Sequence, residues 1–172
     1  DPLGHTTGST YDALGHVLTS VDRNSHTTSS AYDADGNRIS QTSAASETTK
    51  WTYDADERTA TIVDPRGTVT GGNPAAYTTT YGYDAAGNVT SVTDPLGGVR
   101  SAVFDGDNRQ TSTTDALGGV TAFTYDAGSR LTGVTAPDGG ATAYGYDVVG
   151  NLTSRTDANT PVTAYSYDAA HR

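Results

Sequence analysis

Short runs of β-branched and polar residues alternate along the chain with clusters of turn-forming residues. Between two such clusters, VTSVT at 89–93 and VRSAVF at 99–104 contain several β-branched residues and no proline. Runs of this kind favour β-strands, and the Gly, Pro, Asn and Asp clusters between them favour tight turns. No stretch of ten residues keeps a helical period, so the pattern predicts an all-β fold of antiparallel hairpins.

A Tyr-Asp pair marks a tandem repeat of about 21 residues. The interval between pairs is 21 residues, with a single interval of 30. Two strands fit each repeat, so residues 1–172 are predicted to be a single array of eight copies, with both ends falling within a repeat. The structural repeat positions are Tyr11, Asp12, Tyr32, Asp33, Tyr53, Asp54, Tyr83, Asp84, Phe104, Asp105, Tyr125, Asp126, Tyr146, Asp147, Tyr167 and Asp168.

Each repeat contains two turn signals. The first lies four or five residues after the aromatic, as in Gly87-Asn88, and the second opens eleven residues after it, as in DPLGG from Asp94. Proline presets φ, glycine accepts positive φ and aspartate can bond its own backbone, so the second cluster suits a hairpin turn. The nine extra residues of the long interval, near 68–76, follow a second turn, and we expect a longer surface loop there, with a binding loop as the alternative.

Further aromatic residues keep the same register. Trp51, Tyr81, Phe123, Tyr144 and Tyr165 each precede a Tyr-Asp pair by two residues. Alternation along a strand places such a residue on the same face as the following Tyr, about 6.8 Å away and within reach of ring contact. Roughly sixteen strands in one sheet exceed what an open twisted sheet usually holds. We therefore expect the sheet to coil into a spiral shell wall, a wide barrel or a solenoid.

Composition first suggests disorder and then argues against it. Leu, Ile, Val and Phe make up 24 of 172 residues, and the net charge is −10, which is typical of disordered chains. The 11 Tyr, ten of them in register, and the acids held at fixed repeat positions fit a thin, turn-dense sheet instead. Ten basic residues against twenty acids make a nucleic-acid partner unexpected, and no apolar run predicts membrane insertion.

The sequence offers little catalytic chemistry. No nucleophile elbow, phosphate loop or metalloprotease motif is present, and the four histidines occupy turn positions, so we expect no enzyme activity and no cofactor. Stacked aspartates could bind calcium, and DADGN at 33–37 partly matches a calcium loop, although no Glu follows it. The alternative is that these aspartates bond turn amides or pair with Arg58, Arg109 or Arg130, four residues on. Trp51, Tyr81 and Tyr83 form a candidate glycan-binding patch, unless their rings make up the core.

These motifs resemble the YD-repeat (RHS) family, which is similar to the shells of teneurins and insecticidal toxin complexes. The resemblance is carried by YDAAGNVTSVTDPLGG at 83–98, YDADGNRIS at 32–40, YDALGHVLTSVD at 11–22 and YDVVGNLTSRTD at 146–157, and it extends along the whole chain. It implies long antiparallel strands wound into a hollow shell that is structural rather than catalytic. The self-cleaving segment of the toxin members is not matched, and we expect no effector domain within residues 1–172.

The resulting expectation is a non-enzymatic structural module of a secreted or cell-surface bacterial protein, forming part of a β-shell or fibre. A carbohydrate-binding adhesion module and a fragment of a toxin-enclosing shell are the alternatives. Partners would be copies of the chain, joined through terminal strands, or the rest of a longer parent chain, with glycans as further candidates.

Overall fold

A computed structural model describes residues 6–158 and 160–168. Within this part of the chain, fifteen strands form one unclosed antiparallel sheet, in which strand order follows chain order. The predicted all-β fold of tandem hairpins is therefore confirmed. The strands are β1 (Gly8–Tyr11), β2 (Val17–Val21), β3 (Thr27–Tyr32), β4 (Arg38–Thr42), β5 (Thr48–Tyr53), β6 (Thr59–Val63), β7 (Thr78–Tyr83), β8 (Val89–Thr93), β9 (Val99–Phe104), β10 (Gln110–Thr114), β11 (Val120–Tyr125), β12 (Leu131–Thr135), β13 (Ala141–Tyr146), β14 (Leu152–Asp157) and β15 (Thr163–Ala164).

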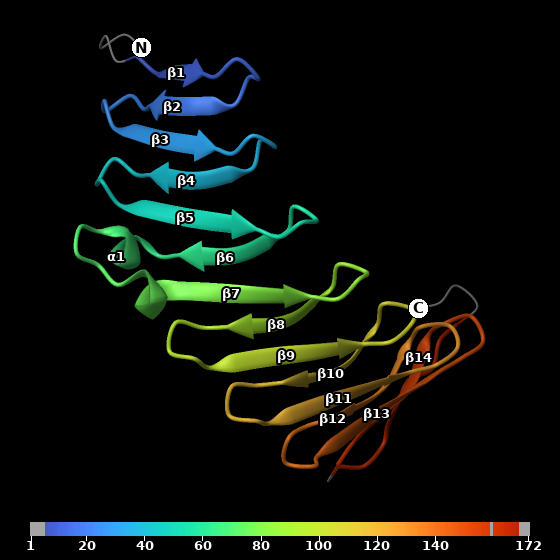
Figure 1. Ribbon diagram of the computed structural model, residues 1–172. Helices are drawn as coiled ribbons and strands as arrows, with labels where there is room; N and C mark the ends of the chain where they lie inside the picture. The colour runs from blue at the N-terminus through green and yellow to red at the C-terminus, as the bar shows by residue number, and fades with distance from the viewer. Residues whose placement is uncertain (1–5, 159, 169–172) are drawn as a thin grey trace. The chain divides into compact units, whose positions relative to one another are not determined.

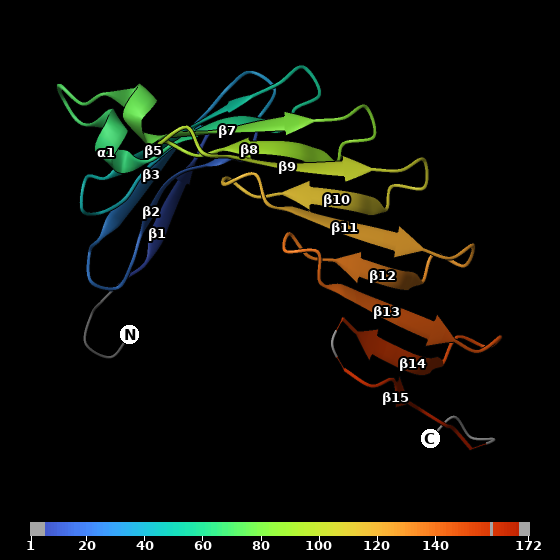
Figure 2. The same ribbon diagram turned by 90° about the horizontal axis from the view of Figure 1, so that it is seen from below.

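The chain divides into two compact units, residues 1–82 with 92–97 and residues 83–91 with 98–172. In the first unit, β1 to β7 succeed one another, with tight turns at both ends of the strands (Figure 1). In the second, β9 to β15 repeat this arrangement (Figure 2). The strands expected at 89–93 and 99–104 are β8 and β9.

A register shift recurs where the Tyr of a Tyr-Asp pair meets the following strand. Thr52 pairs with Thr61, but Tyr53 pairs with Thr59, so Ala60 is the extra residue of a β-bulge. The second unit has the same shift between Thr124 and Tyr125. A bulge bends its strand and strengthens the local twist. The repeat therefore places a bend at the same point of successive hairpins.

Neither face of the sheet covers a conventional core. No hydrophobic side chain among the described residues is buried, and most large side chains in the strands are half-buried. On one face, threonine hydroxyls join neighbouring strands, as in the 2.6 Å contacts of Thr10 with Thr19 and of Thr52 with Thr61. The ladder of backbone hydrogen bonds therefore carries a large share of the stabilisation in so thin a structure.

The expected loop near 68–76 contains two helical turns, α1 (Pro65–Thr68) and η1 (Pro74–Tyr77), at one edge of the first unit (Figure 1). Asp64 caps α1 by accepting a hydrogen bond from the Arg66 amide at 3.0 Å. The Thr68 hydroxyl donates to the Thr48 carbonyl of β5 at 2.6 Å. Gly67, between these anchors, is buried. Most residues of 68–76 are exposed, as expected of a surface loop, and Thr68 anchors the segment to the sheet.

Candidate functional site

The aspartate of each described Tyr-Asp turn closes that turn through backbone amides. After β5, the Asp54 amide donates to the Arg58 carbonyl at 2.9 Å, and Oδ1 of Asp54 accepts from the Asp56 and Arg58 amides at 3.0 Å each. A short carboxylate reaches the amides two and four residues on, which is why aspartate suits this position. The same pair of contacts recurs at Asp12, Asp33, Asp84, Asp105, Asp126 and Asp147.

The tyrosine of the pair links its repeat to the repeat before it. The Tyr125 hydroxyl donates to the Gln110 carbonyl, fifteen residues earlier, at 2.8 Å, and the Tyr146 hydroxyl donates to the Leu131 carbonyl at 2.8 Å. Each acceptor opens the neighbouring strand, just after the preceding Tyr-Asp turn. The bond therefore ties the strand that ends in Tyr to the adjacent strand, which belongs to the preceding repeat. It recurs at Tyr32, Tyr53 and Tyr167.

Arginine at the end of a turn joins two repeats, and we call this arrangement the arginine clasp. Arg109 donates from Nε to Oδ2 of Asp105 at 2.9 Å, and its Nη2 lies 2.8 Å from the same oxygen. Its Nη1 donates to the Asp126 carbonyl of the next turn at 3.1 Å. The guanidinium carbon lies 5.0 Å from the ring centre of Tyr125. One side chain thus contacts two successive Tyr-Asp turns.

The clasp recurs with different side chains. Arg130 bonds Oδ2 of Asp126 at 2.7 Å and the Asp147 carbonyl at 2.8 Å, while lying 5.0 Å from the ring centre of Tyr146. In the first unit, His16 bonds Asp12 at 2.8 Å and stacks on Tyr32 with ring centres 4.7 Å apart. The predicted pairing of turn aspartates with Arg58, Arg109 and Arg130 is confirmed.

These contacts lower the pKa of Asp54, Asp105 and Asp126. The side-chain hydrogen bond from Arg58 is the largest cause at Asp54, and that from Arg109 at Asp105. The Arg130 amide and then its side chain lower the pKa of Asp126. Each bond favours the ionised carboxylate, so the folded chain holds these groups charged to lower pH than an unfolded chain does.

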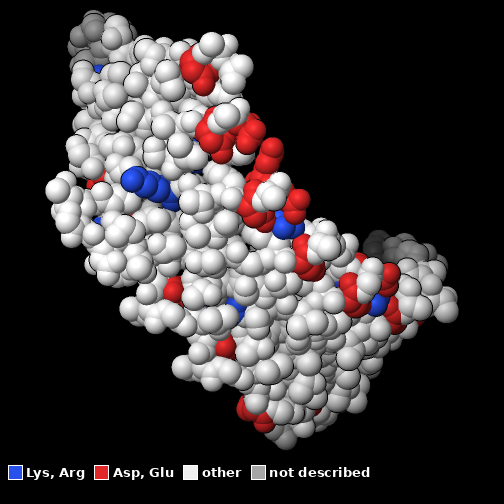
Figure 3. Space-filling view, in the orientation of Figure 1, with Lys and Arg blue, Asp and Glu red and all other residues white. Residues whose placement is uncertain are grey.

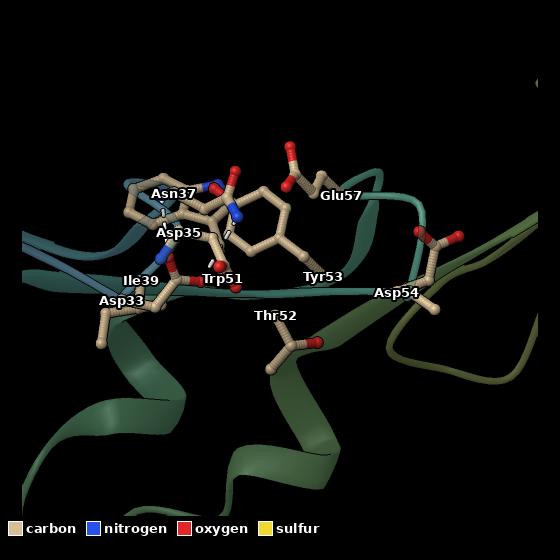
Figure 4. Close-up of a pocket in the computed structure, with 10 residues that line it drawn as sticks. Asp33, Asp35, Asn37, Ile39, Trp51, Thr52, Tyr53, Asp54 and Glu57 are labelled. Carbon is tan, nitrogen blue, oxygen red and sulfur yellow. Dashed lines mark hydrogen bonds between the residues drawn. The ribbon is translucent and has the colours of Figure 1, made fainter.

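Acidic side chains gather along the edge of the first unit that carries the Tyr-Asp turns, with few basic ones among them (Figure 3). A hollow of about 540 Å³ opens at this edge beside Trp51 and Tyr53. Trp51 and Tyr53 lie on one side of β5 and Thr52 points to the other (Figure 4), which confirms that the paired aromatics share a face. The carboxylates lining the hollow are those of Asp33, Asp35, Asp54 and Glu57.

The ring partners of these aromatics differ from the expected ring-to-ring contact within a strand. The guanidinium carbon of Arg38 lies 4.6 Å from the centre of the Trp51 ring, and that of Arg66 lies 4.9 Å from the centre of the Tyr77 ring. A guanidinium is attracted to the negative face of an aromatic ring. Two aromatic rings of the first unit are thus covered by guanidinium groups.

The three candidate glycan-binding residues lie in different surroundings. Trp51 lines the hollow beside Tyr53, whereas Tyr81 lines a second hollow, of about 390 Å³, together with Tyr77 and Arg66. Tyr83 ends β7 and belongs to the second compact unit. Trp51 and Tyr81 therefore line two different hollows of the first unit.

No group of three or more His, Asp or Glu side chains in the described ranges is arranged to hold a metal ion. DADGN at 33–37 folds as an ordinary Tyr-Asp turn, in which Oδ1 of Asp33 accepts from the Asp35 and Asn37 amides. A search of the described helices for one long and apolar enough to cross a membrane finds none.

The arginine clasp is the feature that sequence reasoning missed. Pairing of each arginine with its own turn aspartate follows from their separation of four residues, and it was predicted. The onward bond from Arg109 to the Asp126 carbonyl depends on how successive hairpins align, which spacing alone does not give. A usable signal was present, because Arg109 and Arg130 each stand sixteen residues before a Tyr.

Comparison with solved structures finds similar chains of low sequence identity. The crystal structure of TcdB2-TccC3-TEV is 15% identical, with 96% of this chain and 12% of that chain covered and a TM-score of 0.39. The crystal structure of TcdB2-TccC3 is 16% identical, with 95% and 13% covered and a TM-score of 0.37. A chain of the Tc holotoxin pore of Photorhabdus luminescens is 15% identical, with 97% and 15% covered and a TM-score of 0.29. The chain spans less than one sixth of the length of each.

None of the curated proteins compared with the chain matches it. A family model described as Teneurin YD-shell matches residues 3–172. The matched range includes all eight Tyr-Asp or Phe-Asp pairs and the insertion between β6 and β7. The chain belongs to the Teneurin YD-shell family.

Proposed function

We propose that residues 1–172 act as a non-enzymatic structural array, forming part of the wall of a β-shell or fibre in a secreted or cell-surface bacterial protein. The observation that carries this proposal is the arginine clasp, in which Arg109 and Arg130 bind successive turns to one another. Such contacts hold successive turns at a fixed spacing, which keeps a wall of repeats stiff and in register. Membership of the Teneurin YD-shell family supports the same structural role.

A repeat array gains stability from interfaces between neighbouring repeats, so its stability rises with the number of repeats. The test is a series of chains of two, four, six and eight repeats, unfolded in urea and followed by circular dichroism. The proposal expects midpoints that rise steeply and then level off. Equal midpoints along the series would contradict it, because each repeat would then be stable alone.

The sequence that surrounds the chain in its parent protein distinguishes a toxin-enclosing shell from a fibre. A shell that encloses a toxin and an open fibre use the same wall, and the sequence beyond Arg172 in the source genome distinguishes them. A core-associated segment followed by a variable domain supports a toxin shell. A further series of repeats ending in a surface anchor supports a fibre.

Carbohydrate binding is the second candidate function, because Trp51 and Tyr81 each line an open hollow. Aromatic faces stack on the apolar faces of sugars, and carboxylates accept hydrogen bonds from their hydroxyl groups. A glycan array probed with the intact chain tests this candidate. Binding that is lost in both Trp51→Ala and Tyr81→Ala supports this candidate, while the absence of binding to any glycan rejects it.

A further inference from the structure

The filled arginine clasp shows which groups in this fold recognise a guanidinium. Five groups surround that of Arg109. They are the carboxylates of Asp105 and Asp107, at 2.8 and 3.5 Å from Nη2, the Tyr125 ring, the Asp126 carbonyl and the Ser129 hydroxyl, which is 3.2 Å from Nη1. A planar fork of donors suits such a ring of acceptors, with an aromatic face beneath it.

The hollow beside Trp51 contains the same five positions of the repeat without an arginine. Counted from the Tyr-Asp pairs, the groups equivalent to those around Arg109 are Asp33, Asp35, Tyr53, Asp54 and Glu57, and all five line the hollow (Figure 4). The residue equivalent to Arg109 is Asn37, whose side chain donates to Asp33 and makes no bond to the next turn in the described structure. The hollow of about 540 Å³ therefore lies where a guanidinium lies in the filled clasp.

The acceptors of the hollow are less satisfied than their counterparts. Asn37 donates to Oδ2 of Asp33 at 3.4 Å, compared with 2.7 Å for the equivalent bond from Asn151 to Asp147. Asp56, at the position of Asp35 in the next repeat, pairs with Arg58 at 3.0 Å. Within the described chain, the carboxylates of Asp35 and Glu57 make neither a hydrogen bond nor an ion pair.

Glu57 strengthens the contrast with the filled clasp. It takes the position of Ser129, so a carboxylate stands where Arg109 meets a hydroxyl. The hollow thus offers more negative charge to a ligand than the site that already binds a guanidinium. The guanidinium of Arg38 lies over Trp51, and no cation lies over the Tyr53 ring in the described structure.

We propose that this hollow binds the arginine side chain of a partner polypeptide, which completes in trans the clasp that Asn37 leaves open. The partner is a segment that presents an arginine beyond its own surface. The guanidinium would contact the carboxylates of Asp33 and Asp35 and the Asp54 carbonyl, and would stack on Tyr53. Lysine fits less well, because its ammonium lacks the planar fork that spans two turns.

The intact chain can be tested by fluorescence, because Trp51 is its one tryptophan and lines the hollow. The probe is N-acetyl-arginine amide, with N-acetyl-lysine amide and the neutral N-acetyl-citrulline amide as comparisons. We expect a saturable change with the arginine probe, at least tenfold weaker binding of the lysine probe and no binding of the citrulline probe. Equal responses to arginine and lysine would overturn the proposal, as would the absence of any arginine response.

Variants locate the binding. Asn37→Arg supplies the guanidinium from the chain itself, so it should abolish probe binding and raise the midpoint of thermal unfolding. Asp35→Asn should weaken binding about tenfold. The matched control is Asp107→Asn, which changes the equivalent carboxylate in a clasp already filled by Arg109 and should leave probe binding unchanged.

Each outcome decides between specific and general binding. Retained binding in Asn37→Arg, with the variant folded by circular dichroism, would place the probe elsewhere and overturn the proposal. An equal loss in Asp35→Asn and Asp107→Asn would also overturn it, as an effect of net charge. A Trp51 response to methyl glucoside but not to arginine would reassign the hollow to a sugar. None of these results bears on the structural role of the array.

Discussion

At the scale of the residue, three side chains carry the link between one hairpin pair and the next. Aspartate closes a turn, arginine bonds that aspartate and the following turn, and tyrosine donates to a carbonyl of the preceding repeat. Each contact is partly exposed, so none is strong alone. Their recurrence at fixed positions makes them effective, because every hairpin pair receives the same small stabilisation.

Removing a bridging hydroxyl should lower stability by a small, defined amount. Tyr125→Phe deletes the 2.8 Å bond to the Gln110 carbonyl and keeps the ring, so we expect a loss of about 1 kcal/mol in the free energy of unfolding. Urea denaturation of the intact chain measures this loss. Tyr144→Phe, in β13, the corresponding strand of the next repeat, is the control, because the Tyr144 hydroxyl has no hydrogen bond in the described structure. Equal losses in the two variants would contradict the assignment.

Replacing the clasp arginine by lysine should also be destabilising. In Arg109→Lys the positive charge stays, but the side chain can no longer bond both Asp105 and the Asp126 carbonyl while stacking on Tyr125. We expect a lower unfolding midpoint, measured by circular dichroism. Arg100→Lys, on an exposed position of β9, is the matched control and should change nothing. A midpoint that Arg109→Lys leaves unaltered would show that charge alone suffices.

Acid should weaken the array. The pKa of Asp54, Asp105 and Asp126 lies below the ordinary value of 3.8 in the folded chain, so the unfolded chain takes up protons first as the pH falls. The stabilisation is complete above about pH 5 and declines below it. Urea midpoints at pH 7, 4 and 3 measure the decline, and Asp105→Asn should reduce its size. A midpoint that rises towards pH 3 would contradict this sign.

At the scale of the element, the hairpins were predictable from the sequence, whereas the helical turns of the insertion were not. Alternation and turn residues predicted strands 89–93 and 99–104, because local propensity and tertiary pairing agree there. The two helical turns at 65–68 and 74–77 arise from a proline at each start and from anchoring onto β5, a contact distant in sequence. The hollow beside Trp51 was likewise not predicted, because it forms only when two successive turns align around Asn37.

The insertion tests how closely its turns pack. A Cβ added at Gly67 would lie 2.9 Å from Cβ of Tyr77 and 3.0 Å from Cγ1 of Val63. Gly67→Ala should therefore destabilise the first unit by about 1–3 kcal/mol. Gly106→Ala is the control, because a Cβ there meets no atom within 4 Å. Urea denaturation distinguishes the two, and matching midpoints would mean that the insertion is free to shift.

At the scale of the whole molecule, stability comes from neighbours because no hydrophobic side chain in the described residues is buried. Two repeats alone, for example residues 99–140, keep the Arg109 clasp but lose most other interfaces. We expect such a chain to be unfolded at 25 °C by circular dichroism, while the eight-repeat chain remains folded. A two-repeat chain as stable as the whole would show that the interfaces add little.

The first strand predicts how whole chains associate. All four residues of β1 are exposed, and one edge of this strand has no neighbour within the described sheet. We propose that chains comprising residues 1–172 pair through such an edge and that their mass, measured by sedimentation, rises with concentration. Ser9→Lys should suppress the association by placing a charge on the edge, and Ala86→Lys, in a turn, should not. A monodisperse monomer at high concentration would contradict the proposal.

The clasp and the one-residue bulge together fix the number of residues by which an array of this kind can lengthen. Duplication of 21 residues reproduces the turn, the bulge and every acceptor, so a new copy fits between two old ones without other changes. Duplication of 20 or 22 residues would turn one strand over and exchange its aromatic and threonine faces. The nine residues added between β6 and β7 fall outside the paired segments, at the hairpin end opposite the clasps. The number of repeats is therefore free to vary, whereas insertions of other lengths are confined to the hairpin end opposite the clasps.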